Sequence, residues 1–235
     1  MFDFSGKIVL IPGGTGALGS AIVQEFIDCN ATVIATYLND KNVNLKSKTD
    51  KITEMIKINV TNEAEVSAAI ANLSQKYGRI DIMANVVGGY LGGKSVTEIS
   101  ENEWSGMMNL NLMSAFLLTK YVIPAIKASK HGGKIVHISS MTGLNANGLD
   151  SAYAASKAGL IRLVESASQE VKNDEININC ILPSIIDTKA NRKAMPDKDF
   201  SKWVKPHDLA NVILFLCSEY GKAITGAAIP TRGFL

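Results

Sequence analysis

The first thirty residues constrain the fold most, because they combine an apolar run, a glycine-rich turn and a helical pattern. The run KIVLI covers residues 7–11, the turn PGGTGALG follows, and apolar residues then recur at helical spacing from Ala21 to Ile27. Strand, glycine turn and helix in this order are typical of dinucleotide-binding units. We expect Gly13 to permit the turn and Gly19 to permit close helix packing, so that N–H groups at the helix start can hold a pyrophosphate.

The rest of the chain continues this alternation of strands and helices. Further strands are expected at residues 31–37, 54–60, 80–87, 134–139, 176–182 and 227–230. Helices are expected at residues 61–77, 100–129, 152–172 and 207–220, with Thr61 as the N-cap of the first of these. The chain shows no linker, low-complexity tract or repeat of fixed period. The pattern predicts one α/β domain over residues 1–235, a Rossmann fold whose doubly wound parallel sheet has about seven strands.

Composition favours a soluble globular protein. It is 46% hydrophobic and 20% charged, and 24 basic against 22 acidic residues give a net charge of +2. Nothing in this balance indicates a nucleic-acid or membrane partner. Cys29, Cys180 and Cys217 are isolated and the three histidines lack ligand spacing, so we expect neither a disulfide framework nor a metal site. With no signal-peptide pattern and no apolar window of ~18 residues, the expected location is the cytoplasm.

The strongest candidate site lies between residues 135 and 157. Ser140 follows an apolar run, and Tyr153 and Lys157 are four residues apart, which places them on one face of a helix. A cation beside Tyr153 would favour the phenolate, so we expect its pKa to fall toward a value useful for proton transfer. The group would suit interconversion of an alcohol and a carbonyl. A Tyr and a Lys four apart also occur on many solvated helix faces, so the pair alone does not decide the matter.

The end of the second strand bears on the choice of cofactor. An acidic residue there would bind a ribose 2′-hydroxyl, whereas a basic residue nearby would suit a 2′-phosphate. The chain has Tyr37, followed by Leu38 and Asn39, with Lys41 as the nearest cation. The missing acid favours NADP(H) slightly over NAD(H).

Three other stretches are candidates for ligand contact. Gly88, Gly89, Gly92 and Gly93 form either a plain loop or a place where the backbone approaches a ligand. Asn111 is a polar residue amid an apolar helical face, either solvated or locally hydrogen-bonded if it has no functional role. Residues 188–203 are polar and break the periodicity, so we expect a mobile substrate loop over the site.

The order of these motifs resembles the short-chain dehydrogenase/reductase family over essentially the whole chain. The motifs are the glycine turn, NVVG, a helical Asn, ISS, YAASK and INCILPS, and Ser140 precedes Tyr153 by the thirteen residues that the family shares. The resemblance implies that Tyr153 is the general acid/base and that Lys157 lowers its pKa and binds the nicotinamide ribose. It implies that Ser140, not Ser139, orients the substrate carbonyl, and that Asn111 supports a water-linked proton relay.

The resemblance also implies where the cofactor binds. The implied cofactor contacts are Gly13, Thr15, Gly16, Ala17, Leu18, Gly19, Tyr37, Asn59, Val60, Asn85, Gly88, Tyr153, Lys157, Pro183, Ile186 and Thr188.

Several residues depart from the family pattern. They are Pro12 in place of Thr, Ala17 at the middle glycine position, Asn59 in place of Asp, Val86 in place of Asn and Ser184 in place of Gly. The chain end ITGAAIPTRGFL is also unusual, and GGTGALG is reminiscent of dihydropteridine reductases. These changes leave every implied catalytic side chain in place and bear mainly on cofactor affinity and preference.

The resemblance implies an NAD(P)-dependent oxidoreductase that moves a hydride between nicotinamide and a carbonyl or alcohol substrate. Carbonyl reduction of a 3-oxoacyl thioester or other small ketone is the first expectation. A sugar or polyol dehydrogenase, a dihydropteridine-reductase-like enzyme and a non-catalytic dinucleotide-binding scaffold remain alternatives. Family members usually form homotetramers through the helix after Asn111 and the helix that carries Tyr153, so a homo-oligomer, tetramer or dimer, is expected.

Overall fold

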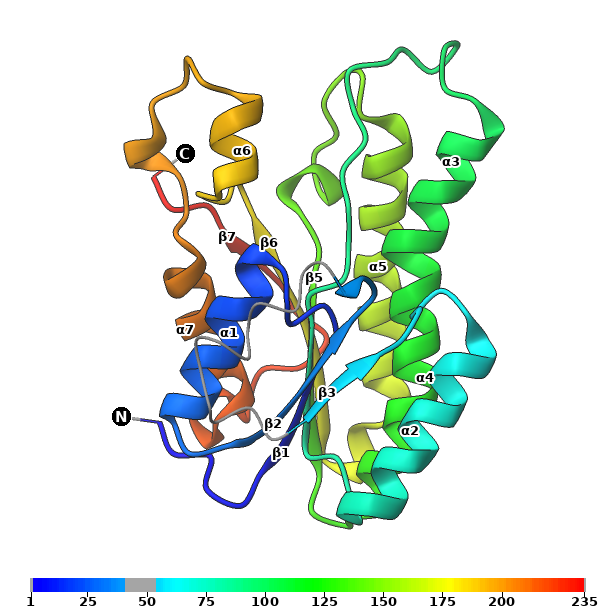
Figure 1. The fold of residues 1–235 in the computed structure, drawn as a ribbon, viewed down its shortest axis with the longest axis vertical. Helices are drawn as coiled ribbons and strands as arrows, with labels where there is room; N and C mark the ends of the chain where they lie inside the picture. Colours follow the sequence, from blue (N-terminus) through cyan, green and yellow to red (C-terminus); the bar gives the residue numbers. More distant parts are fainter. Residues whose placement is uncertain (1, 41–53, 235) are drawn as a thin grey trace.

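The computed structural model describes residues 2–40 and 54–234, and within them a seven-stranded sheet forms the centre of the molecule (Figure 1). The strand order is β3-β2-β1-β4-β5-β6-β7, and all neighbouring pairs are parallel. The strands are β1 Ile8–Ile11, β2 Thr32–Tyr37, β3 Glu54–Lys57, β4 Ile82–Asn85, β5 Gly133–Ile138, β6 Ile176–Pro183 and β7 Ala228–Thr231. This confirms the predicted doubly wound parallel fold.

Helices cover both faces of the sheet, as the apolar strands require. On one face lie α1 (Ala17–Asp28) and α7 (Pro206–Cys217), which pack on each other (Figure 1). On the other lie α2 (Glu63–Tyr77), α4 (Ser114–Lys127) and α5 (Ser151–Glu170). Successive strand residues point to opposite faces, so Val9 packs in the core beside α1 and Leu10 in the core beside α4. Both faces are therefore buried.

The sheet grows from β1 in two directions: β2 and β3 lie on one side of β1, and β4 to β7 lie on the other. In open parallel sheets, ligands bind at the carboxyl ends of the strands at such a point. Here the exits of β1 and β4 are joined by a hydrogen bond of 3.0 Å from Val86 N to Pro12 O. The glycine turn and the glycine-rich stretch after β4 thus lie side by side.

Several boundaries differ from the sequence predictions. The N-cap of α2 is Asn62, whose side chain accepts from Glu65 N, whereas Thr61 bonds to Asn59. β3 ends at Lys57 instead of residue 60. The helix predicted at 100–129 consists of α3 (Glu101–Met107), a π-helical turn (Met108–Met113) and α4.

The segment 188–203 contains regular structure, which periodicity did not predict. Thr188 caps α6 (Lys189–Ala194) by accepting from Asn191 N at 3.1 Å, and a 3-10 turn follows at Phe200–Lys202. Arg192 binds both carboxylate oxygens of Asp187, at 2.5 and 2.7 Å, and lies 4.8 Å from the ring centroid of Phe200. The ion pair of Arg192 with Asp187 and its contact with the Phe200 ring therefore help to order this polar segment.

The three cysteines lie in the hydrophobic interior, and all are free thiols. Residues 2–40 and 54–234 contain no cluster of metal-ligating side chains. Among the described helices, none has the length and apolar character needed to cross a membrane.

Candidate functional site

The turn between β1 and α1 is so tight that its glycines are required. Gly13 has a φ of +78°, which favours glycine. A Cβ at Gly19 would lie 2.2 Å from Gly13 O, and a Cβ at Gly14 would lie 2.8 Å from the Cβ of Ala35. The turn therefore brings the first turn of α1 directly against the end of β1, as predicted for Gly13 and Gly19.

The N-terminus of α1 is open to an anion. Gly16 is its N-cap and makes no side-chain capping bond, and the first turn holds no acid. By contrast, α2 and α3 are capped by Asn62 and Ser100 and carry acids in their first turns. Because helix N-termini leave N–H groups without partners and carry partial positive charge, this end fits a pyrophosphate.

The structure brings Ser140, Tyr153 and Lys157 together in one hollow of about 280 Å³ at the carboxyl ends of the strands. Ser140 follows β5 and accepts from Thr142 N at 3.2 Å, while the other two residues stand on α5. Of the predicted cofactor contacts, four more line this hollow: Leu18, Gly88, Pro183 and Ile186. Three of the four predicted catalytic residues and part of the predicted cofactor set therefore line one hollow, and the fourth, Asn111, does not line it.

Lys157 is a buried ammonium group, only 4% exposed, and its Nζ donates to Ile138 O at 2.7 Å. Burial lowers the pKa of Lys157 to about 8. A Cβ at Gly88 would lie 3.2 Å from this Nζ and 3.0 Å from Asn111 Oδ1. Glycine at position 88 thus allows the β4 exit to pass close to both side chains.

The prediction that Lys157 lowers the pKa of Tyr153 is wrong for this structure. Burial raises the pKa of the phenol, a hydrogen bond with Ser140 lowers it, and the charge of Asp150 raises it, with a net increase. The Lys157 ammonium binds a backbone carbonyl instead of the phenol, and its Nζ lies 6.0 Å from the Tyr153 ring centroid. Tyr153 therefore stays protonated at neutral pH.

Asn111 is buried in the π-helical turn, a feature frequent at functional sites. Its Oδ1 accepts from Gly89 N at 2.9 Å, and its Nδ2 donates to Gly89 O and to Ser156 Oγ, both at 3.0 Å. Ser156 in turn donates to Tyr153 O at 2.8 Å. The Asn111 amide therefore clamps the exit of β4 to the helix that carries Tyr153.

Asn85 lies below this exit in a buried network with His137 and Thr119. The Thr119 hydroxyl donates to Ala115 O at 2.7 Å, so at 3.1 Å it accepts from His137 Nε2–H. Asn85 Nδ2 donates to His137 Nδ1 at 3.1 Å, and Asn85 Oδ1 accepts from Val87 N at 3.1 Å. The network thus requires the neutral Nε2–H tautomer of His137 and fixes the β4 exit through Asn85.

This network predicts an acid sensitivity. Burial, with a smaller effect of Lys157, lowers the pKa of His137 from 6.5 to about 3. Between these values the unfolded chain binds the proton and the folded chain does not, so the stability contributed by neutral His137 is lost as pH falls. We expect about 3 kcal/mol less unfolding free energy at pH 4 than at pH 7 from this group.

Urea unfolding of the parent and of His137→Gln at several pH values between 4 and 7 measures this contribution. The difference in unfolding free energy between the two proteins should shrink as pH falls. Parallel pH curves would show that His137 does not carry the acid sensitivity.

The other predicted cofactor contacts lie outside the hollow that holds Tyr153. Asn59 uses its Oδ1 to accept from Thr61 N and Oγ1, and Val60 is buried. Tyr37 ends β2 beside Lys57 of β3, whose ammonium pairs with Asp40 at 2.6 Å. Thr188 caps α6. Lys41, the cation considered for a 2′-phosphate, lies outside the described residues.

Among the polar side chains that line the hollow, sequence reasoning did not single out Tyr90 and Asn191. Asn191 donates from Nδ2 to Ile186 O at 2.8 Å and so shapes the wall on the α6 side. Tyr90 lies within the glycine-rich stretch after β4. An isolated aromatic residue in such a stretch was the sequence signal that could have identified it.

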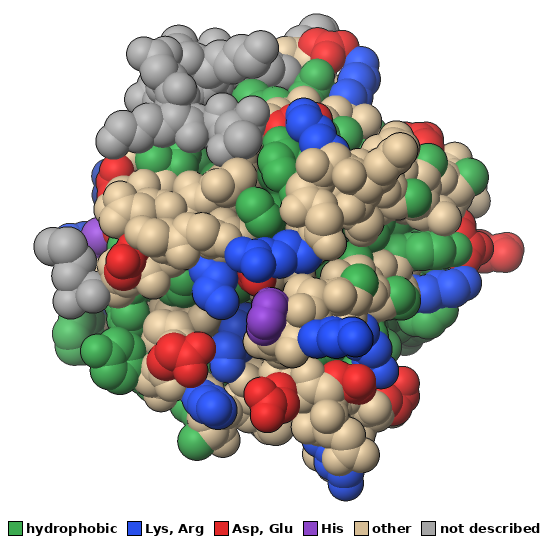
Figure 2. Space-filling view, turned by 90° about the horizontal axis from the view of Figure 1, so that it is seen from below, with side chains coloured by type: hydrophobic (Ala, Val, Ile, Leu, Met, Phe, Trp, Pro, Cys, Tyr) green, Lys and Arg blue, Asp and Glu red, His purple; other side chains and the backbone are tan. Residues whose placement is uncertain are grey.

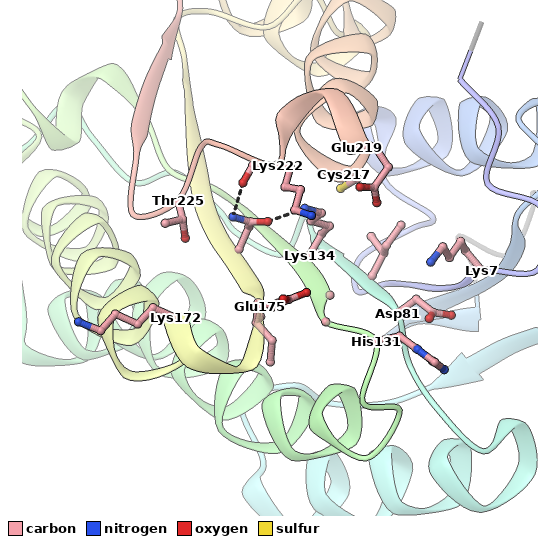
Figure 3. Close-up of a pocket in the computed structure, with 15 residues that line it drawn as sticks. Lys7, Asp81, His131, Lys134, Lys172, Glu175, Cys217, Glu219, Lys222 and Thr225 are labelled. Carbon is pink, nitrogen blue, oxygen red and sulfur yellow. Dashed lines mark hydrogen bonds between the residues drawn. The ribbon is translucent and has the colours of Figure 1, made fainter.

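A larger hollow, about 390 Å³, lies at the opposite end of the strands. Figure 2 shows basic side chains and a histidine on this face, and Figure 3 shows Lys7, Asp81, His131, Lys134 and Glu219 around the hollow. Lys134 donates to Asn177 Oδ1. Charges of both signs line it and it is remote from Tyr153, so its size does not make it the reaction site.

Comparison with known proteins identifies the group to which these features belong. A family model described as enoyl-(acyl carrier protein) reductase matches residues 14–233. The chain is 31% identical to 3-oxoacyl-[acyl-carrier-protein] reductase FabG of Thermotoga maritima, with 98% of each chain covered. The chain belongs to the short-chain dehydrogenase/reductase family. It is 28% identical to the FabG reductase of Escherichia coli, again with 98% of each chain covered.

Solved structures agree on the fold of this short-chain dehydrogenase/reductase. A short-chain type dehydrogenase/reductase from Mycobacterium ulcerans superposes with a TM-score of 0.93 at 20% identity, covering 99% of this chain and 90% of that one. Carveol dehydrogenase from Mycobacterium avium, solved in complex with NAD, gives 0.88 at 22% identity, covering 99% and 98%. Together with the sequence relatives, family membership makes the chain an NAD(P)-dependent oxidoreductase.

Proposed function

We propose that the protein reduces the carbonyl group of a small ketone or 3-oxoacyl thioester, with Tyr153 as the proton donor. The observation that carries this proposal is the convergence of Ser140, Tyr153 and Lys157 in one hollow at the carboxyl ends of the strands. The open N-terminus of α1 lies at the same end of the sheet and fits the cofactor's phosphates.

The proposed cofactor site draws on several segments of the chain. The turn residues Gly13, Thr15, Gly16, Ala17, Leu18 and Gly19 would hold the pyrophosphate, because the turn is compact and α1 is uncapped. Lys157 would hold the nicotinamide ribose beside Gly88. The adenine end would lie toward Tyr37, Asn59 and Val60, and Pro183, Ile186 and Thr188 would close the nicotinamide end. When bound, the nicotinamide supplies the hydride that reduces the carbonyl carbon.

The proton is supplied by the protein. Because burial raises the pKa of Tyr153, its hydroxyl is protonated at neutral pH and is suited to donate to the oxygen of a carbonyl being reduced. Ser140, which lines the same hollow, would orient that oxygen. Asn111 would hold the β4 exit and α5 in register. Its role in a water-linked relay stays a prediction, since both of its Nδ2 protons are already donated.

The substrate class is proposed from the two FabG relatives, whose names give 3-oxoacyl thioesters of acyl carrier protein. The matching family model is instead described as an enoyl reductase, which would reduce a C=C bond. Sugar or polyol dehydrogenation and dihydropteridine reduction remain the alternatives within the enzyme class. A panel containing a 3-oxoacyl thioester, an enoyl thioester, a sugar alcohol and a quinonoid dihydropterin separates these functions by nicotinamide absorbance.

We propose a preference for NADPH over NADH, because β2 ends at Tyr37 and not at an acidic residue. Parallel fluorescence titrations with the two reduced cofactors measure this preference. A lower dissociation constant for NADPH supports it, and a lower one for NADH overturns it. We also propose that the enzyme is cytoplasmic and that residues 1–235 form a single domain. Residues 188–203 would lie beside the substrate.

A homo-oligomer is also proposed, through the face formed by the π-helical turn, α4 and α5. A shallow hollow there is lined by Met108, Asn109, Leu112, Met113, Phe116 and Leu163. Met113 and Phe116 are 44% and 42% exposed. A second copy of the chain would bury this apolar surface, in the manner that the family resemblance implies.

We therefore expect Phe116→Glu to lower the oligomeric state, because a charge would be buried in the interface. Light scattering after size-exclusion chromatography measures the mass of the variant and parent. Val96→Glu is the matched control, since Val96 is 71% exposed and lies outside this face. An unchanged mass for Phe116→Glu, or a parent that is monomeric, would contradict the proposed interface.

A further inference from the structure

Tyr90 and Asp150 form a contact beside Tyr153 that the proposed chemistry does not use. Tyr90 belongs to the glycine-rich stretch after β4, and Asp150 directly precedes α5. The Tyr90 hydroxyl donates to Asp150 Oδ1 at 2.8 Å. The Tyr90 ring lies edge-on to that of Tyr153, with centroids 5.0 Å apart and planes at 79°.

We propose that Tyr90 and Asp150 are a positioning pair that holds the Tyr153 phenol in place and sets a negative charge beside it. The inference rests on the proposed function of Tyr153 as proton donor.

The first support is that the two segments are tied by backbone as well as side chains. Gly93 N donates to Leu149 O at 2.9 Å, next to the bond between Tyr90 and Asp150. Leu149 has a φ of +69°, a conformation that costs free energy for a residue other than glycine. Backbone strain of this kind persists only where surrounding contacts enforce it. Here it occurs where the stretch after β4 meets the start of α5.

The second support is that the stretch leaves no room for a side chain at the contact. A Cβ at Gly92 would lie 2.1 Å from the Tyr90 hydroxyl oxygen and 2.3 Å from Asp150 Oδ1. Glycine at position 92 is therefore what allows the hydroxyl and carboxylate to meet. Tyr90 is 66% exposed, yet its hydroxyl is hydrogen-bonded to Asp150, a residue that is only 9% exposed.

The third support is the hydrogen bonding of the Asp150 carboxylate. As the N-cap of α5, an aspartate commonly accepts a backbone N–H of the first turn, but Asp150 makes no such bond. Its carboxylate binds Tyr90 instead. Burial and Asp150 together raise the pKa of Tyr90 to about 12, so Tyr90 remains a donor to Asp150 over the working range.

The side chains that surround Tyr153 come from three directions. Ser140 approaches from the end of β5, Lys157 from the next turn of α5, and the Tyr90–Asp150 pair from the β4 exit and the start of α5. His137 of β5 is buried and neutral. Among these, Asp150 carries the negative charge, which disfavours the phenolate and so favours a protonated donor.

Two conservative variants test the pair with opposite expected signs. Asp150→Asn keeps an acceptor for Tyr90 but removes the charge, so the Tyr153 phenol should titrate about 0.5–1 pH unit lower. Tyr90→Phe keeps the ring but removes the donor that partly neutralises Asp150, so the phenol should titrate at higher pH. Asp174→Asn and Tyr121→Phe are matched controls, because Asp174 pairs with Lys127 and the Tyr121 hydroxyl with Glu63, on other elements.

The phenol is followed by the ultraviolet absorbance of tyrosinate, as the difference between each protein and its Tyr153→Phe counterpart. The alkaline limb of the pH profile of kcat for carbonyl reduction should move with it, because the donor must be protonated. Cofactor affinity, from nicotinamide fluorescence, should stay unchanged. A merely structural role would move stability without shifts of opposite sign.

Unshifted phenol titrations in both variants, or shifts of the same sign, would overturn the inference even if Tyr153→Phe abolishes turnover. The absorbance titration needs no turnover, so it tests the pair even if the proposed function fails. If Asp150→Asn does not fold, Tyr90→Phe alone must still raise the phenol's titration point.

Discussion

Replacing Tyr153 by Phe is expected to lower kcat for carbonyl reduction by about 10²–10⁴-fold, the usual contribution of a positioned proton donor. The variant removes one oxygen and keeps the ring that packs against Tyr90. Nicotinamide binding should change by less than about threefold, because the turn before α1 and Lys157 are untouched. The assay is loss of NADPH absorbance on addition of a 3-oxoacyl thioester, with cofactor affinity measured separately by fluorescence.

Tyr121→Phe is the matched control for this substitution. The Tyr121 hydroxyl donates to Glu63 at 2.9 Å on the outer side of α4, away from the hollow, so its removal should leave kcat unchanged. Equal turnover of the parent and Tyr153→Phe would remove Tyr153 as proton donor. Equal loss of turnover and of cofactor binding would indicate collapse of the site instead of a missing proton.

Gly19→Ala is expected to abolish cofactor binding at useful concentrations, a loss of about 100-fold or more in affinity. The new Cβ would lie 2.2 Å from Gly13 O and 2.9 Å from Gly14 Cα, both backbone atoms that cannot rotate away. Either α1 or the glycine turn must shift, which would misplace the N–H groups proposed to hold the pyrophosphate. Such overpacking also lowers stability by about 1–3 kcal/mol.

Gly106→Ala is the control, because a Cβ there meets no atom within 4 Å and the residue lies within α3. Alanine also has the higher helix propensity, so this variant should bind cofactor normally and be no less stable. The measurement is a fluorescence titration with NADPH beside a thermal unfolding curve. Normal NADPH affinity in Gly19→Ala would show that the turn does not hold the cofactor.

The fold could be predicted because its determinants are local. Apolar runs bounded by glycine and alternating with helical patterns specify strands buried on both faces, and short connections leave few topologies. Strand ends were less predictable: β3 stops at Lys57 although apolar residues continue to Val60, which packs in the core without extending the strand. The π-helical turn at Asn111 keeps the apolar pattern of an ordinary helix, so periodicity does not distinguish it.

The central residues of the site could be predicted from spacing, whereas their surroundings could not. Ser140, Tyr153 and Lys157 lie within one continuous stretch, so chain order alone predicts their proximity. The His137 network joins residues 52 and 18 positions apart, which only tertiary contact reveals. The same limit explains the error on Tyr153, because neither its burial nor the bond from Lys157 to Ile138 is visible in the order of residues.

Oxidation of NADPH on addition of a 3-oxoacyl thioester to the parent protein tests most directly whether this site reduces carbonyls. Absorbance should fall with formation of one hydroxyl product per NADPH consumed, and the rate should drop in Tyr153→Phe. NADPH that binds but is not oxidised by any carbonyl of the panel would contradict carbonyl reduction, and would leave a dinucleotide-binding scaffold as the better description of the protein.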